Sequence, residues 1–81
     1  MTSKVGSEYT KNYRITLSED VTERDQALVR SKNDLMDLVD KEYYSGELEK
    51  YSVVSGVSVT AVYRDSSNIW TVEYIVYFVV Q

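Results

Sequence analysis

The fold is decided by the end of the chain, Ile69-Trp-Thr-Val-Glu-Tyr-Ile-Val-Tyr-Phe-Val-Val80. This run is rich in β-branched and aromatic residues, which predicts a strand. Because side chains alternate across a strand, one face would carry Trp70, Val72, Tyr74, Val76, Phe78 and Val80, and the other Ile69, Thr71, Glu73, Ile75, Tyr77 and Val79. Both faces are largely apolar, and a domain this small has one layer to cover one of them. We therefore expect the second face to contact another copy or a partner.

The preceding segment, residues 52–64, predicts a second strand that forms a hairpin with the first. Asp65-Ser-Ser-Asn68 is a short polar turn of the kind that joins hairpin strands. A four-residue loop would pair Arg64 with Ile69. The face turned away from a covering helix would then hold Val54, Gly56, Ser58, Thr60 and Val62 opposite Val79, Tyr77, Ile75, Glu73 and Thr71.

Residues 22–44 predict a long amphipathic helix, because apolar residues recur there with a period near 3.6. The stripe consists of Val21, Leu28, Leu35, Val39 and Tyr43, flanked by Ala27, Ser31, Leu38 and Met36. Asp20 with Glu23, or Thr22 with Asp25, offers an N-terminal cap. Gly46 can adopt the left-handed conformation that ends a helix.

The first strand is expected at residues 12–17, after a polar, flexible N-terminal arm at residues 1–11, so that residues 12–81 form a single domain. A helical crossover leaves the first and second strands parallel, and the last strand then fits between them, antiparallel to both. The predicted fold is α+β, a two-layer sandwich with one long helix on a three-stranded antiparallel or mixed sheet. Its order is β-α-β-β with a C-terminal β-hairpin.

The composition removes most of the chemistry that small domains perform. The 81 residues include no Cys and no His, so a disulfide framework, a thiolate metal site and a histidine base are all excluded. Two carboxylates could act as an acid and base pair, but one helix on three strands offers little cleft to hold them. We expect no catalytic residues, no metal and no cofactor. We also expect a cytoplasmic protein, because no signal peptide is visible and Glu73 interrupts the apolar C-terminal run.

The charge of the chain is concentrated in its middle. Net charge is −4, and residues 18–49 carry ten acidic against four basic side chains. This balance argues against direct nucleic-acid binding and favours a basic protein partner. Asp34, Asp37 and Asp40 recur along the outward side of the helix. They could be a solvated face in which Asp37 pairs with Lys41, a phosphate-mimicking row that occupies the nucleic-acid groove of an enzyme, or a metal site.

The open end of the outward sheet face is the candidate partner-binding surface. Its residues would be Val54, Ile75, Tyr77 and Val79, with Gly56 leaving a notch opposite Tyr77. The eight Tyr and one Trp of the chain are residue types that supply large contact area at interfaces, although they are also good strand formers. Glu73 is expected opposite Thr60 and near Arg14, as a paired charge that sets register.

Two resemblances extend this interpretation. The β-α-β-β order and the pattern Trp70-x-Val72-x-Tyr74-x-Val76-x-Phe78-x-Val80 are similar to dodecin, a small flavin-binding protein that assembles into a dodecamer. The chain differs from that family at Ser18-Glu19-Asp20, where the family has Gly-Thr-Ser after the first strand, and its second strand lacks the Trp that stacks on the flavin. In size and charge the chain resembles short acidic virus-encoded proteins, including anti-CRISPR proteins and DNA mimics. The second resemblance implies a homodimeric binder or inhibitor acting in the host cytoplasm, and the first a ligand-binding or structural homo-oligomer.

Overall fold

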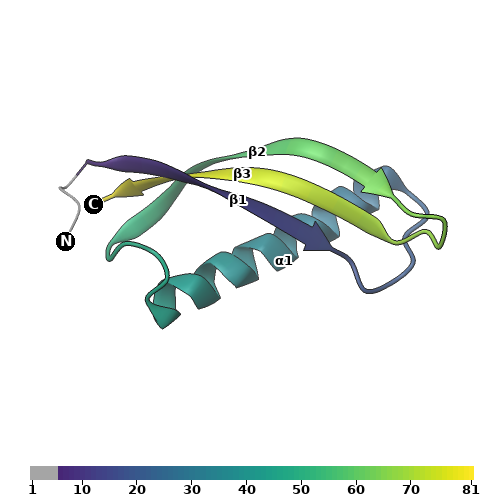
Figure 1. The fold of residues 1–81 in the computed structure, drawn as a ribbon, viewed down its shortest axis with the longest axis horizontal. Helices are drawn as coiled ribbons and strands as arrows, with labels where there is room; N and C mark the ends of the chain where they lie inside the picture. The colour runs from purple at the N-terminus through teal and green to yellow at the C-terminus, as the bar shows by residue number, and fades with distance from the viewer. Residues whose placement is uncertain (1–5) are drawn as a thin grey trace.

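The computed structural model describes residues 6–81 as one helix packed on one face of a three-stranded antiparallel sheet (Figure 1). The elements are β1 (Glu8–Thr16), α1 (Arg24–Ser45), β2 (Ser52–Arg64) and β3 (Trp70–Val80). The strand order is β1-β3-β2, with β3 antiparallel to both neighbours. The predicted α+β fold and the central position of the last strand are confirmed.

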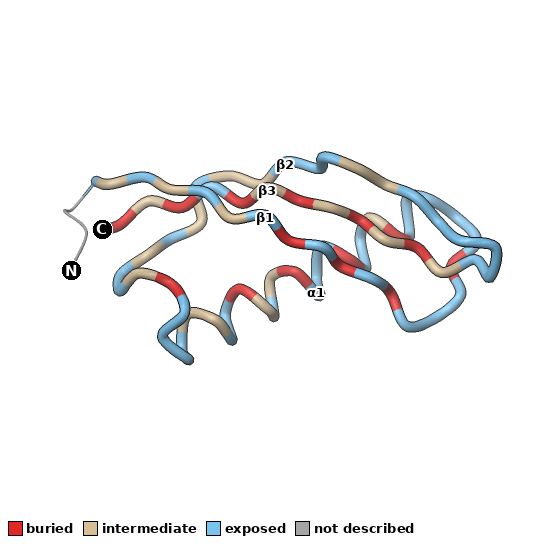
Figure 2. Tube along the Cα trace, viewed as in Figure 1, coloured by how far each residue is buried: buried red, intermediate tan, exposed pale blue. Residues whose placement is uncertain are grey.

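The core lies between α1 and the helix-facing side of β3 (Figure 2). Every side chain on that side of β3 is buried, namely Trp70, Val72, Tyr74, Val76, Phe78 and Val80. From the helix, Leu35 and Val39 fill the centre, while the small residues Ala27 and Ser31 are fully buried and allow close approach to the sheet. The Ser31 hydroxyl donates to the Leu28 carbonyl at 3.0 Å and also bonds the Tyr74 hydroxyl, so this buried polar group is satisfied.

The two ends of α1 are built differently. At the C-terminal end Gly46 has φ 87°, and the amides of Gly46 and Glu47 donate to the carbonyls of Tyr43 and Glu42, as expected for this glycine. The predicted N-terminal side-chain cap is absent, because Glu23 occupies the cap position and makes no side-chain bond there. The segment before the helix is held instead by tertiary contact, since the Trp70 indole N–H donates to the Val21 carbonyl.

The first strand begins at Glu8, earlier than the predicted start at residue 12, so the predicted arm over residues 1–11 is wrong from Glu8 onward. Residues 1–5 lie outside the described part of the chain. Contacts with β3 account for the longer strand. Tyr9 stacks on Phe78 with ring centroids 5.0 Å apart, and the Val80 amide donates to the Ser7 carbonyl at 2.9 Å. Cross-strand pairing thus orders a segment that shows no pattern by itself.

The hairpin between β2 and β3 also differs from the prediction. Arg64 pairs with Trp70 rather than with Ile69. The loop closes because the Asp65 carboxylate accepts the amides of Ser67 and Ile69 at 2.8 and 3.1 Å, and Asn68 takes the left-handed conformation at φ 61°. The Asp65 amide also donates to the Ile69 carbonyl at 3.0 Å, so the loop is one residue shorter than the four-residue loop assumed from the sequence.

Two bulges in β2 change which of its residues face the helix. The predicted register holds from Gly56 to Val59, and it shifts by one residue on either side, at Ser55 and Thr60. Each bulge residue uses its hydroxyl to bond a β3 carbonyl, Ser55 that of Tyr77 at 3.2 Å and Thr60 that of Glu73 at 3.1 Å. Side chains outside the central stretch therefore exchange faces.

The helix does not cover the sheet evenly. α1 packs against β1 and β3, and the radius of gyration is 14.2 Å, against about 12 Å for a typical domain of this length. As a result Val59, on the helix-facing side of β2, remains 48 % exposed. Within residues 6–81 no helical segment combines the length and the apolar character needed to cross a lipid bilayer.

Tyr51, the residue before β2, has a strained backbone. It has φ 66°, which is unfavourable for a bulky side chain, and its backbone is held there by bonds to Tyr43 and Gln81. We expect Tyr51→Gly to raise the free energy of unfolding by about 1 kcal/mol, because glycine adopts this conformation without the steric cost. Urea denaturation followed by circular dichroism measures the change.

Tyr51→Ala is the matched control for this strain. Alanine removes the ring but keeps the Cβ atom, so it should give no such gain. A Tyr51→Gly variant that is no more stable than Tyr51→Ala would contradict the strain at this position.

Candidate interaction surfaces

The outward face of the sheet carries apolar side chains near the start of β2 and the end of β3, and polar ones along β1. Tyr77 lies between Thr10 and Gly56, Ile75 between Asn12 and Ser58, and Val79 between Glu8 and Val53. We call the set Val53, Ile75, Tyr77 and Val79 the sheet patch. Tyr77 and Val53 are 41 % and 44 % exposed. The Tyr77 ring lies over Gly56, at 3.6 Å from the position of a Cβ there, so an alanine would also fit beneath the ring.

Val54 is not part of this patch, although the sequence predicted it there. The bulge at Ser55 pairs Val54 with Phe78, on the side of the sheet that faces the helix, where it packs against the core. Val53 takes its place on the outward face. Val62, also predicted to face outward, pairs with Val72 and packs against the core as well. A register predicted from strict alternation of side chains along the strand cannot include such bulges.

A polar network closes one side of the sheet patch. Glu73 pairs with Arg14 across the strands, with Arg14 Nε 3.6 Å from Glu73 Oε2, as the sequence predicted. Its other neighbour is Ala61 rather than Thr60, and the Tyr63 hydroxyl donates to Glu73 Oε2 at 2.7 Å. This hydrogen bond to a carboxylate raises the pKa of Tyr63 above its usual value. Arg14, Glu73 and Tyr63 thus form a structural polar network at the edge of the sheet patch.

The acidic row of α1 faces solvent, since Asp34, Asp37 and Asp40 are all exposed. In the described chain, ion pairs join Lys11 to Glu42, Arg14 to Glu73 and Arg30 to Glu19. The predicted pair between Asp37 and Lys41 is not among them. The row therefore keeps its negative charge available at the surface.

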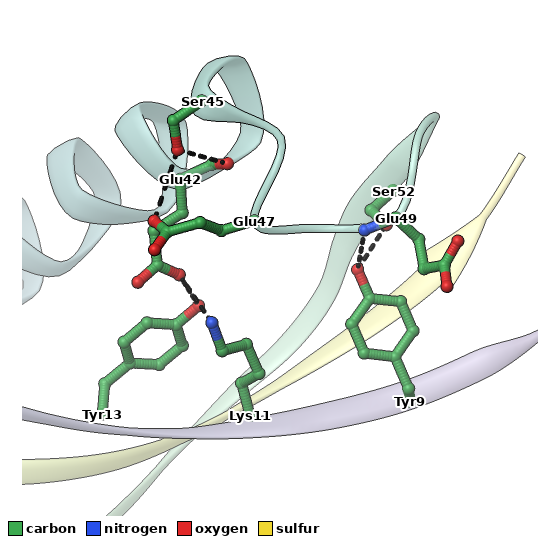
Figure 3. A network of polar contacts seen from close by, with 8 residues as sticks. All are labelled: Tyr9, Lys11, Tyr13, Glu42, Ser45, Glu47, Glu49 and Ser52. Carbon is green, nitrogen blue, oxygen red and sulfur yellow. Dashed lines mark hydrogen bonds and ion pairs between the residues drawn. The ribbon is translucent and has the colours of Figure 1, made fainter.

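A partly buried carboxylate joins the last turns of α1 to β1 (Figure 3). Glu42 Oε1 accepts the Tyr13 hydroxyl at 2.6 Å and Lys11 Nζ at 3.0 Å. Burial and, to a smaller extent, the bond to Glu42 raise the pKa of Tyr13 well above its ordinary value. Burial acts to raise the pKa of Glu42 as well, but the bonds from Tyr13 and Lys11 outweigh it and the pKa is lowered. Sequence analysis missed this network because its members lie far apart in the chain.

A second polar contact ties the loop after α1 to the same strand (Figure 3). The Tyr9 hydroxyl bonds the Ser52 hydroxyl and accepts the Glu49 amide at 3.3 Å. Tyr9 thereby connects β1 with the start of β2. These bonds hold the loop between α1 and β2 in place against β1.

Next to this loop lies a hollow that the sequence did not reveal. It has a volume of about 230 Å³ and opens between the C-terminal half of α1 and the first residues of β2. It is lined by Val39, Asp40, Tyr43, Tyr44, Leu48, Ser52, Val53, Val54 and Phe78, so Val53 of the sheet patch also borders it. We call it the aromatic hollow. Tyr44 at its rim is 85 % exposed and meets the Tyr43 ring edge to face at 5.3 Å. The clue available in the sequence was Tyr44 itself, a large aromatic that lies outside the apolar stripe of the predicted helix.

The sheet patch, the acidic row and the aromatic hollow all lack the composition of a metal site. The part of the chain from residue 6 onward contains no group of three or more acidic, His or Cys side chains placed to hold a metal ion. What the surfaces offer is apolar and aromatic contact area beside carboxylates, which suits recognition of another protein. Comparisons with protein-family models, with curated protein sequences and with solved structures gave no match to this chain.

Proposed function

We propose that this chain is a non-enzymatic protein-interaction module, a small acidic homodimer that binds a basic protein partner. The sheet patch provides the contact between copies, and the acidic side of α1 faces the partner. Inhibition of a nucleic-acid-processing protein by such a surface is the mode of action most consistent with this charge, because a row of carboxylates competes for a basic channel.

The main support for a dimer is the exposure of the sheet patch. Its four side chains are adjacent on two hydrogen-bonded strands, and none of them is charged. The surrounding outward positions are polar, on β1 and at Glu73. An apolar centre with a polar border is the anatomy of an interface. A two-fold axis through the patch would bring like surfaces together and bury Tyr77 in both copies.

Tyr77→Asp should convert the dimer to a monomer. A charge buried in the interface without a partner costs several kcal/mol, which exceeds what a small patch can offset. Size-exclusion chromatography with light scattering measures the mass, and we expect twice the single-chain mass for the wild type and the single-chain mass for the variant. Circular dichroism shows whether the variant has folded.

Thr10→Asp is the matched control, because Thr10 lies directly opposite Tyr77 on the same face but on the polar strand. It should remain dimeric, while Val53→Asp should dissociate as Tyr77→Asp does. A wild type that stays monomeric at high concentration, or a dimer insensitive to both Tyr77→Asp and Val53→Asp, overturns the sheet patch as the dimer contact.

A further inference from the structure

We infer that the aromatic hollow binds an arginine side chain from a basic segment of the partner protein. This inference rests on the proposed function, since it identifies the feature of a basic partner that the chain recognises. It concerns a surface that shares only Val53 with the sheet patch, and it is tested separately.

The floor of the hollow is part of the core. Val39, Leu48 and Phe78 are each at most 7 % exposed, and all three line the hollow. Its volume of about 230 Å³ equals that of about eight liquid water molecules, which is room for one long side chain. An apolar floor of this size favours the aliphatic stem of arginine over a short polar side chain.

Two aromatic rings border the mouth of the hollow, where the charged group of a bound arginine would lie. Tyr43 and Tyr44 both border the hollow, and Tyr44 offers most of its ring to solvent. A guanidinium group stacks on tyrosine and is attracted by the face of its ring. The chain already places cations in this way, with Lys50 Nζ 5.3 Å from the Tyr51 ring centroid and Arg64 Cζ 5.4 Å from the Trp70 ring centroid.

Asp40 completes the chemistry of the rim. It lines the hollow, is exposed, and takes part in none of the ion pairs found within residues 6–81. Residues 37–53 contain five carboxylates against two lysines, so the surroundings attract a cation. A planar guanidinium can bond a carboxylate through two N–H groups at once while its stem lies on the apolar floor. Charge and shape thus point to the same occupant.

The bulge at Ser55 is what builds this hollow. By turning Val54 toward the helix it adds an apolar wall on the side of β2. Strict alternation would have placed Val54 on the outward face and left Ser55 on the helix-facing side. The position of the bulge therefore links the shape of the hollow to the composition of the sheet patch.

The test is a titration of the ¹⁵N-labelled protein with N-acetyl-arginine amide, followed by backbone amide chemical shifts. The control ligand is N-acetyl-citrulline amide, which has nearly the same shape without the charge. We expect saturating shifts at the amides of Asp40, Tyr44 and Val54. The arginine ligand should bind roughly three- to thirtyfold more tightly than the citrulline ligand, the range given by one cation–π contact with one exposed ion pair.

Asp40→Asn should reduce the preference for arginine to that of the cation–π contact alone, about two- to fivefold. Asp34→Asn is the matched control, because Asp34 belongs to the same exposed row of α1 but lies outside the hollow, and it should preserve the preference for arginine. The proposal is overturned by shifts that do not saturate, by equal binding of the two ligands to the wild type, or by equal effects of the two Asn variants.

The same titration on Tyr77→Asp separates the two proposals. Tyr77 lies outside the hollow, so arginine binding should survive in this variant even though the dimer is lost. Loss of the dimer contact with intact arginine binding would leave the hollow as a site on a monomer. A wild type that is dimeric but does not bind the arginine ligand would overturn the arginine site and leave only the sheet patch as an interaction surface. Dissociation of the wild-type dimer by the arginine ligand would show that a second copy fills the hollow, which contradicts a foreign partner.

Discussion

Phe78→Ala should remove about 3–5 kcal/mol from the free energy of unfolding, the loss typical of a large aromatic deleted from a core. Phe78 is 1 % exposed, lies on the central strand and stacks on Tyr9 of β1. A chain of this length has a total stability of about 4–12 kcal/mol. The variant is therefore expected to be partly or wholly unfolded at 25 °C, as measured by urea denaturation with Trp70 fluorescence and circular dichroism.

Tyr44→Ala is the control for this substitution. Tyr44 is as large an aromatic, but its ring is in solvent and alanine is a better helix former, so the free energy of unfolding should change by less than about 0.5 kcal/mol. A Phe78→Ala variant that loses less than about 1 kcal/mol would mean that the neighbours of Phe78 close the cavity. In that case the thin core would be more adaptable than its close packing indicates.

Glu42→Ala should cost about 1–3 kcal/mol, because it leaves the partly buried Tyr13 hydroxyl without its acceptor. Lys11 would lose its ion pair at the same time, with a smaller effect because it is more exposed. Urea denaturation at neutral pH measures the loss. Glu47→Ala, which removes an exposed carboxylate from the adjacent loop, should change stability by less than about 0.5 kcal/mol.

The same network makes stability depend on pH in a defined direction. The pKa of Glu42 is lowered from 4.5 in the folded chain, so its contribution is present above pH 4.5 and is lost as the pH falls through the folded value. The pKa of Tyr13 is raised from 10.0, so its contribution is present below pH 10.0 and is lost as the pH rises further. Glu42→Gln should flatten the acid side of the profile relative to Glu47→Gln. Identical acid profiles for the two variants would contradict a special role for Glu42.

The sequence determined the elements and their order. The fully apolar last strand, the 3.6-residue stripe of the helix and Gly46 at its end are local patterns, and each had one consistent interpretation. The central position of β3 followed from the same patterns, because a strand that is apolar on both faces gains most between two neighbours. The exposure of Asp34, Asp37 and Asp40 was likewise readable from helical periodicity.

What only the tertiary structure decided lies in β2 and at the two ends of the sheet. The bulges at Ser55 and Thr60 are stabilised by hydroxyl bonds to carbonyls of another strand, and no local pattern specifies them. They exchanged Val54 for Val53 on the outward face and so changed the candidate site. The early start of β1 and the Glu42 network depend in the same way on partners distant in sequence. Local periodicity fixes which residues form an element, whereas register and buried polar pairing are set by contacts that exist only once the elements have met.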